Sequence, residues 1–173
     1  MPRLNAEELR ARLSRDLPGA VLANTPLQVS APPAHGPQPA KLTSADTLVD
    51  PTQIVAAATY LRDTLGYAFL SDIAVVDYLV EDIFELVYRF YNVEGGPALA
   101  LKIRVPRDVP EVPSLTPAWP GANFHEREAF DLYGITFIGH PFLRRIYMWD
   151  EFEGFPMRKD FPRQGDKYIG EDE

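Results

Sequence analysis

The sequence predicts an α+β domain of two layers, in which a mixed or mostly antiparallel sheet has its helices on one face and is followed by an extended, irregular C-terminal segment with one short helix. Three observations lead to this prediction. No proline occurs between Pro51 and Pro97, although 17 of the 173 residues are proline. Within this window a helical pattern is followed by segments that alternate between apolar and polar residues. Beyond residue 106 prolines recur every few residues, and the periodic patterns end.

The N-terminal part, residues 1–50, is expected to hold one short helix and a linker. Residues 5–16 place leucines on one face of a helix and arginines largely on the opposite face. The proline-rich stretch 26–39 cannot form a core, apart from a short strand at residues 27–29. This part is therefore expected to be a short helix followed by a proline-rich linker.

The middle part, residues 51–113, is expected to form the α+β core domain. Asp50 is placed as the N-cap and Pro51 as the first residue of an amphipathic helix that ends at Gly66. Strand patterns follow at residues 69–79, 83–91 and 99–105. One face of the resulting sheet is apolar and the other carries Lys102 and Arg104, so we expect helices to cover the apolar face.

The last part, residues 114–173, has a different character. A short helix is expected at residues 124–133, with Asn123 as its N-cap and Glu126 as the capping-box partner. The stretch that follows has no period, yet it is rich in aromatic residues and arginines, which are enriched at protein–protein contacts. We therefore predict that this segment lies extended across a partner and wraps it. The residues alone leave open the alternative that it packs back on its own sheet.

Composition excludes several classes of protein. The chain has no cysteine, which excludes disulfides, cysteine-ligated Fe–S clusters and cysteine-based zinc sites. Its formal net charge of -8 disfavours binding to nucleic acid. No apolar run is long enough for a transmembrane helix, and the N-terminus lacks the pattern of a signal peptide. The simplest expected location is the cytoplasm, docked on a larger assembly.

One hypothesis for the last part is a stand-alone enzyme or a carboxylate–metal protein. Its residues would be His125, Glu126, Glu128 and His140. Iron sites built from Glu-x-x-His pairs need two copies plus further carboxylates, and this chain has three histidines in all. Neither a glycine-rich phosphate loop nor a serine nucleophile motif is present. The sequence therefore favours structural roles for these side chains.

The structural interpretation assigns a partner to each charged group. Arg127 and Asp131 are spaced to form an ion pair on one helix. His140, beside Pro141 in a loop, is expected to form a hydrogen bond with the backbone. The basic pairs of the segment are interleaved with acids, which favours salt-bridge networks over binding of phosphate.

Three runs of sequence identify a family. ANFHEREAFDLYGI at 122–135, FIGHPFLRRI at 137–146 and EGFPMRKDFP at 153–162 strongly resemble the signature of the C subunit of NADH:quinone oxidoreductase, respiratory complex I. The resemblance covers residues 51–163. Two positions depart from the family, since Trp149 stands at a usual proline and Phe155 at a usual histidine.

This resemblance implies a non-catalytic extrinsic subunit of the hydrophilic arm of a proton-pumping complex. Such a protein would dock on the quinone-site (D) subunit and on other subunits of that arm, at the cytoplasmic side of the bacterial cell membrane, with no membrane span of its own. The complex passes electrons from NADH to quinone through FMN and Fe–S clusters in other subunits, and this chain would bind no cofactor or metal. The alternative is the equivalent subunit of a ferredoxin- or deazaflavin-dependent quinone-reducing complex or of a membrane-bound hydrogenase.

The resemblance also implies a set of interface and signature residues, with no catalytic, cofactor-binding or metal-binding residue among them. The arginines and the lysine of this set would pair with acids on the partner or within the segment, and the aromatics between them would be the buried anchors. The set is Glu126, Arg127, Glu128, Asp131, Gly134, His140, Pro141, Arg144, Arg145, Arg158, Lys159 and Asp160.

Overall fold

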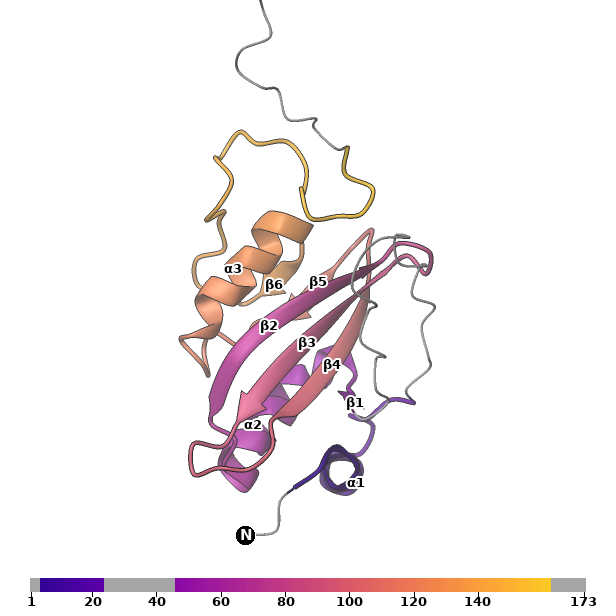
Figure 1. The fold of residues 1–173 in the computed structure, drawn as a ribbon, viewed down its shortest axis with the longest axis vertical. Helices are drawn as coiled ribbons and strands as arrows, with labels where there is room; N and C mark the ends of the chain where they lie inside the picture. Colours follow the sequence, from indigo (N-terminus) through magenta and orange to yellow (C-terminus); the bar gives the residue numbers. More distant parts are fainter. Residues whose placement is uncertain (1–3, 24–45, 163–173) are drawn as a thin grey trace, which may run out of the picture.

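The computed structural model describes residues 4–23 and 46–162, and its elements are labelled in Figure 1. The strand expected at residues 27–29 and the proline-rich stretch lie outside the described residues. Along the chain the elements are α1 (Ala6–Asp16), β1 (Thr47–Leu48), a 3-10 turn (Pro51–Gln53), α2 (Ile54–Leu65), β2 (Phe69–Tyr78), β3 (Ile83–Tyr91), β4 (Leu99–Pro106), β5 (Glu111–Pro113), α3 (Ala122–Tyr133) and β6 (Thr136–Ile138).

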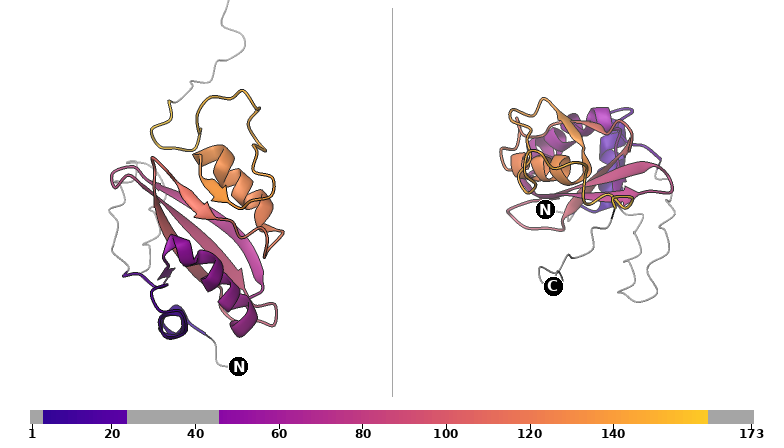
Figure 2. Two further views of the ribbon diagram at one scale, coloured as in Figure 1. Left: turned by 180° about the vertical axis from the view of Figure 1, so that it is seen from behind. Right: turned by 90° about the horizontal axis from the view of Figure 1, so that it is seen from above.

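The main sheet is mixed, as predicted. Its strand order is β1-β4-β3-β2, with β1 parallel to β4 and the other neighbours antiparallel. Helices α2 and α3 lie on the same face of this sheet, which Figure 2 shows from behind and from above. The two-layer α+β architecture predicted from the sequence is therefore confirmed.

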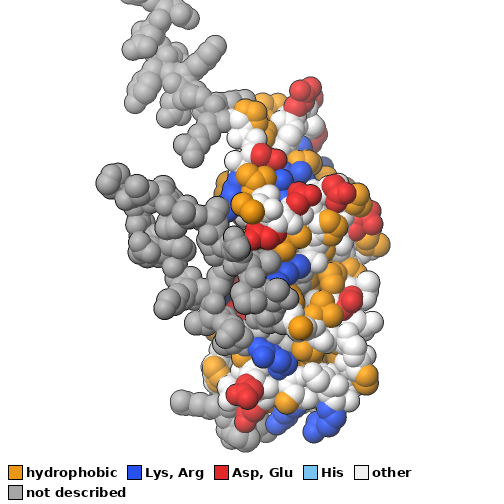
Figure 3. All heavy atoms as spheres, turned by 90° about the vertical axis from the view of Figure 1, so that its right-hand side faces the viewer, with side chains coloured by type: hydrophobic (Ala, Val, Ile, Leu, Met, Phe, Trp, Pro, Cys, Tyr) orange, Lys and Arg blue, Asp and Glu red, His pale blue; other side chains and the backbone are white. Residues whose placement is uncertain are grey.

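Strand β3 shows how the sequence pattern builds the two layers. Phe84, Tyr88 and Phe90 point toward the helices, and each is fully buried. The opposite face carries Glu85, which forms ion pairs with Lys102 at 3.2 Å and with a neighbouring arginine of β4. The period-two pattern thus separates an aromatic core from a charged face. On the side of the molecule drawn in Figure 3, hydrophobic, acidic and basic side chains are interspersed over the described surface.

Helix α2 begins and ends at the residues that the sequence indicates. The Asp50 carboxylate accepts a hydrogen bond from the Thr52 backbone N–H at 2.8 Å, and Pro51 starts the 3-10 turn that leads into the helix. Gly66 ends it with φ 78°, in the left-handed region. The buried side of α2 packs small alanines toward the sheet, so helix and sheet approach closely.

One hydrophobic core includes side chains from all three parts of the sequence. Leu9 and Leu13 of α1 are fully buried in it, together with Leu115 and Ile135 from the last part. Strand β1, which precedes residue 50, pairs with β4. The first and last parts of the chain are thus joined to the central sheet by packing.

Three short strands have no counterpart in the sequence prediction: β1, which pairs with β4, and the strands β5 and β6. β5 and β6 form a separate parallel pair, which the Ser114 N–H extends by donating to the Ile138 carbonyl at 2.9 Å. β5 and β6 have three residues each, which is too short for an alternating pattern to be recognised. Their pairing places the loop before α3 next to the loop that follows β6. The site described below includes residues of both loops.

Candidate interaction surface

Helix α3 carries four of the twelve residues that the sequence singles out, namely Glu126, Arg127, Glu128 and Asp131. It begins at Ala122, runs to Tyr133 and is followed by Gly134, which has φ 76°. The helix packs against β2. Its inner side carries Glu126 and Asp131, and both acidic side chains are fully buried. A buried carboxylate is stable only when it is hydrogen-bonded, so the partners of these two acids define what the region does.

Glu126 joins α3 to the loop that follows β5. Its carboxylate accepts hydrogen bonds from the Ser114 hydroxyl at 2.6 Å, the Leu115 backbone N–H at 2.6 Å and the Thr116 hydroxyl at 2.9 Å. Burial raises the pKa of Glu126, and the three hydrogen bonds oppose this rise. The predicted capping box with Asn123 is wrong, because the helix already begins at Ala122 and Glu126 faces the interior.

His140 faces Glu126 from the loop after β6. Its side chain is fully buried, with Nε2 3.9 Å from Oε2 of Glu126. Nδ1 accepts a hydrogen bond from the Phe142 backbone N–H at 3.0 Å, which is the backbone contact expected for this histidine. A nitrogen that accepts this bond carries no proton, so neutral His140 has its proton on Nε2, on the side of the carboxylate. Exposed Pro141 follows it at the turn.

Asp131 is the acceptor for the loop that starts at residue 145. Its Oδ2 accepts hydrogen bonds from the successive backbone N–H groups of Ile146 (2.9 Å), Tyr147 (2.7 Å) and Met148 (3.0 Å). Its Oδ1 pairs with Nη1 of Arg145 at 2.7 Å. Burial by itself would raise the pKa of Asp131, but these hydrogen bonds hold it below its usual value. The ionised carboxylate therefore organises an irregular loop that lacks backbone ladders of its own.

Arg145 extends this anchor to the far side of the loop. While Nη1 pairs with Asp131, Nη2 donates to the carbonyl oxygens of Phe152 and Gly154, both at 3.1 Å. The guanidinium also lies over the rings of Phe152 and Phe155. One side chain thus connects the helix to two points of the loop, so Arg145 has a structural role within this chain.

Arg127 does not form the ion pair with Asp131 that the helical spacing predicts. Instead, Nε donates to the carbonyl oxygen of Arg144 at 3.0 Å and Nη2 donates to that of Arg145 at 3.2 Å. The prediction fails because the Asp131 carboxylate is occupied by Arg145 and by backbone N–H groups of the loop, while the Arg127 guanidinium is occupied by two backbone carbonyls. Glu128, also on α3, is partly exposed.

A second anchor holds residues 158–160 to the end of the sheet. Asp77 of β2 accepts a hydrogen bond from the Lys159 backbone N–H at 2.8 Å and pairs with Nε of Arg107 at 2.9 Å. Nη2 of Arg107 contacts Oδ1 of Asp160 at 2.6 Å, and this hydrogen bond lowers the pKa of Asp160. The backbone of Lys159 and the side chain of Asp160 are thus bound to two side chains of the core domain.

Asp77 and Arg107 are missing from the predicted set of site residues. Asp77 lies opposite Phe84 in the ladder, on the face that packs against the helices. A charged residue at a core-facing position of a strand signals a buried partner, because a lone buried charge is too costly. The sequence of β2 contains this signal at Asp77, but it does not identify the partner of the charge.

Gly134 is required by the close approach of the loop to the end of α3. A Cβ atom at this position would lie 2.5 Å from the ring of Phe155 and 2.9 Å from Nη2 of Arg158. Arg158 donates to the Tyr133 carbonyl at 2.7 Å and lies over the Phe155 ring, and its burial lowers its pKa. The glycine therefore supplies both the left-handed turn and the space for this contact.

The C-terminal segment thus folds on its own chain. This is the alternative that the sequence left open, and it arises because carboxylates of α3 and β2 bind the backbone N–H groups of the segment. Contact of the segment with a partner stays a prediction. Large apolar side chains nevertheless remain at its surface, as predicted for a docking segment. These are Phe142, Tyr147, Trp149 and Met157.

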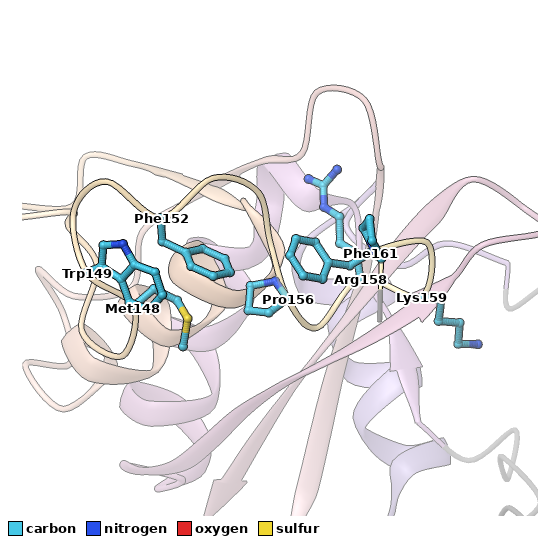
Figure 4. Close-up of a pocket in the computed structure, with 8 residues that line it drawn as sticks. Met148, Trp149, Phe152, Pro156, Arg158, Lys159 and Phe161 are labelled. Atoms are coloured by element: carbon cyan, nitrogen blue, oxygen red, sulfur yellow. The ribbon is translucent and has the colours of Figure 1, made fainter. Parts of the chain in front are cut away.

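Trp149, one of these exposed side chains, borders a shallow groove of about 560 Å³ that Phe152 and Phe161 also line. Figure 4 shows Met148, Trp149 and Phe152 together on one side of it and Phe161 on the other, while the side chain of Lys159 points away. Trp149 and Phe152 meet edge to face with their ring centroids 4.9 Å apart. Since Trp149 is 62% exposed, this groove presents an aromatic surface that could bind an apolar side chain of a partner.

The hypothesis of a metal site finds no matching cluster. Within residues 4–23 and 46–162, no group of three or more histidine, aspartate or glutamate side chains is placed to hold a metal ion. Glu126 and His140 do face each other, but His125 lies partly exposed on the first turns of α3. In the same part of the chain, no helix is long and apolar enough to cross a membrane.

The fold and this surface define an α+β domain that carries an anchored loop segment with aromatic residues at its surface. The chain belongs to the family described as "Respiratory-chain NADH dehydrogenase, 30 Kd subunit", whose model matches residues 47–167. This result confirms the family that the three signature runs indicate.

Relatives and solved structures agree with this assignment. The C 2 subunit of NADH-quinone oxidoreductase from Rhizobium etli (strain CIAT 652) is 51% identical over 122 residues, which are 69% of this chain and 65% of that protein. The C subunit of the Moorella thermoacetica enzyme is 46% identical over 117 residues, which are 68% of this chain and 79% of that protein. The chain thus spans less than two thirds of the length of the Rhizobium etli relative.

Two solved structures have a similar fold. A trypsin-resistant fragment of Nqo5 (1–134) has a TM-score of 0.51 and 32% identity, over 56% of this chain and 80% of that chain. A chain from the membrane-bound sulfane sulfur reductase, an archaeal respiratory membrane complex, has a TM-score of 0.67 and 24% identity, over 90% of this chain and 85% of that chain. The second likeness extends the fold over nearly the whole chain.

Proposed function

We propose that this chain is a non-catalytic, peripheral subunit of the hydrophilic arm of a proton-pumping NADH:quinone oxidoreductase. In this proposal it docks on the quinone-site subunit, at the cytoplasmic side of the membrane. Electrons pass from NADH through FMN and Fe–S clusters to quinone in other subunits, and this chain holds none of these groups. Relatives named as C subunits of NADH-quinone oxidoreductase, at 46% and 51% identity, support the choice of complex.

One observation carries the docking role. In the loop from residue 139 to residue 162, Asp131 and Asp77 accept hydrogen bonds from backbone N–H groups. The aromatic side chains of Phe142, Tyr147 and Trp149 stay exposed. A rigid loop with exposed aromatics loses little conformational entropy when it binds, which favours a stable protein contact. The buried acids Glu126 and Asp131 are occupied by structural hydrogen bonds, which supports a non-catalytic role.

The alternative is the equivalent subunit of a ferredoxin- or deazaflavin-dependent complex or of a membrane-bound hydrogenase. A chain of an archaeal respiratory membrane complex has a similar fold, which is compatible with this alternative. At 24% identity, this similarity concerns the fold alone. The bacterial relatives favour the NADH-linked complex.

The test is purification of the tagged chain from membranes of its native host, solubilised in a mild detergent. We expect the quinone-site subunit and the other hydrophilic-arm subunits to co-purify, and the preparation to reduce quinone with NADH. Deletion of the gene should abolish NADH:quinone reduction in the membranes, and the purified chain alone should show no turnover. Recovery of the chain as a free monomer, or turnover by the chain alone, would contradict the proposal.

A further inference from the structure

A second surface patch lies next to the first turns of α3, and it shares no residue with the aromatic groove. It consists of Phe124, Arg127, Phe142 and Arg144, and we call it the Phe142 patch. The two rings are 66% and 53% exposed. The Arg127 guanidinium lies 5.9 Å from the Phe124 ring centroid and 5.8 Å from that of Phe142, and the Arg144 guanidinium lies 4.2 Å from the latter. The four side chains therefore form one continuous surface.

The charges of this patch are not neutralised within the described part of the chain. Arg127 donates to two backbone carbonyls, and Arg144 contacts the face of Phe142. Neither has a carboxylate within ion-pair distance among the residues that the structure describes, whereas Arg145 and Arg107 each pair with a buried aspartate. Positive charge in an acidic chain is thus left at an exposed position beside two apolar rings.

Arg144 and Arg145 are neighbours in sequence with opposite roles. The side chain of Arg145 turns inward to Asp131 and holds the loop, as described above. Arg144 is exposed, and its guanidinium rests on the Phe142 ring. A guanidinium that stacks on an aromatic ring keeps its planar set of N–H donors for a carboxylate.

We infer that the Phe142 patch binds a carboxylate-bearing segment of the partner protein, with Arg144 paired to an aspartate or glutamate and apolar neighbours of that acid covering Phe124 and Phe142. This inference rests on the proposed function and names the chemistry of the partner surface. Charge complementarity argues for an acid. The two exposed rings argue for a protein segment and against a polyanion, which the net charge of -8 would also repel.

The test compares binding of the purified full-length chain to the complex isolated from a strain that lacks it. The variants are Arg144→Gln and, as the matched control with the same change of charge, Arg15→Gln on the exposed side of α1. We expect affinity to fall about tenfold for Arg144→Gln and to stay unchanged for Arg15→Gln. Wild-type affinity should also fall with rising KCl concentration, and more steeply than that of Arg144→Gln. An unchanged thermal unfolding midpoint for Arg144→Gln excludes misfolding.

A second measurement detects the carboxylate directly. The Arg144→Lys variant places an amine at the same position, and a zero-length carbodiimide reagent joins an amine to a carboxylate that it touches. We expect a new cross-link in the assembled complex between position 144 and an aspartate or glutamate of the partner. The Arg15→Lys variant should give no cross-link to the partner.

The outcomes separate this inference from the proposed function. Failure of the wild-type chain to bind the depleted complex overturns both. Binding of wild type and Arg144→Gln with equal affinity and equal salt dependence overturns the inference and leaves the proposed function intact. Assembly of the Arg144→Lys variant without a new cross-link at that position also counts against a carboxylate partner.

Discussion

Asp131 of α3 and Arg145 of the following loop form a partly buried ion pair, with Oδ1 and Nη1 2.7 Å apart. The same carboxylate accepts three backbone N–H groups, and the same guanidinium donates to two further carbonyl groups. The pair therefore replaces the backbone ladder that an irregular segment lacks. It explains how residues without regular structure can present a defined surface.

Replacement of one member of this pair should unfold the loop. We expect Asp131→Asn to lower the free energy of unfolding by about 3 kcal/mol, because it leaves a partly buried guanidinium without its counter-charge and weakens three hydrogen bonds to the loop backbone. Urea unfolding followed by circular dichroism gives this value. The control is Asp63→Asn, in the exposed pair with Arg62, where the loss should stay below about 1 kcal/mol. Equal losses in the two variants would show that Asp131 does not organise the loop.

The buried acid of the first signature run should give stability an unusual dependence on pH. Burial raises the pKa of Glu126 above its ordinary value of 4.5. Its contribution is therefore fully present below pH 4.5 and is lost as the pH rises through the pKa of the folded state. We expect the stability advantage of wild type over Glu126→Gln to shrink as the pH rises toward neutrality. Urea unfolding at several pH values measures the difference in unfolding free energy between wild type and Glu126→Gln. A difference that grows with pH would contradict the raised pKa.

Asp131 should behave in the opposite way. Its folded-state pKa lies below the ordinary value of 3.8, so its contribution is present above pH 3.8 and is lost as the pH falls through the folded-state value. The difference in unfolding free energy between wild type and Asp131→Asn should accordingly shrink on acidification. If the two acids instead gave differences that changed in the same direction with pH, one of the two assignments would be wrong.

Gly134 should be the least replaceable glycine of the described segment after α3. Gly134→Ala incurs the cost of positive φ and a clash with the Phe155 ring at 2.5 Å, and we expect a loss of about 2–4 kcal/mol. Gly139 also has positive φ, at 83°, but a Cβ there would meet nothing within 4 Å. Gly139→Ala should therefore lose only about 1 kcal/mol. Thermal unfolding of both variants measures the difference, and equal losses would rule out the clash.

Trp149 should matter for assembly and little for stability. Because the side chain is 62% exposed, we expect Trp149→Ala to lower the unfolding free energy by no more than about 1 kcal/mol. Binding to the complex that lacks this chain should weaken by at least about 30-fold, as for an aromatic anchor at a protein contact. Val93→Ala, at an exposed turn of the sheet, is the control and should affect neither quantity. Unchanged binding by Trp149→Ala would remove the groove from the docking surface.

Local patterns predicted the regular elements well. The strand at 83–91 was predicted with the bounds that the structure has, since its aromatic and polar residues alternate without interruption. The ends of α2 and α3 follow from Gly66 and Gly134, which supply the left-handed conformation. Each of these signals depends on residues within a few positions of one another, so a single sequence contains them.

The predictions that failed concern contacts between distant parts of the chain. Helical spacing predicted Arg127 as the partner of Asp131, but the donors of Asp131 come from residues 145–148. Asp77 binds the backbone of Lys159, a residue 82 positions away. No periodicity connects such positions, because their proximity depends on how α3 and the loop pack over the sheet.

The sequence by itself determined the α+β class, most of the element boundaries, the family and the presence of an aromatic, arginine-rich final segment. Tertiary structure alone decided which of its charges turn inward to hold the segment and which, like Arg144, remain at the surface. The physical reason is that burial makes an unpaired charge costly. An arginine is therefore structural or available for a partner according to whether the fold brings a carboxylate to it.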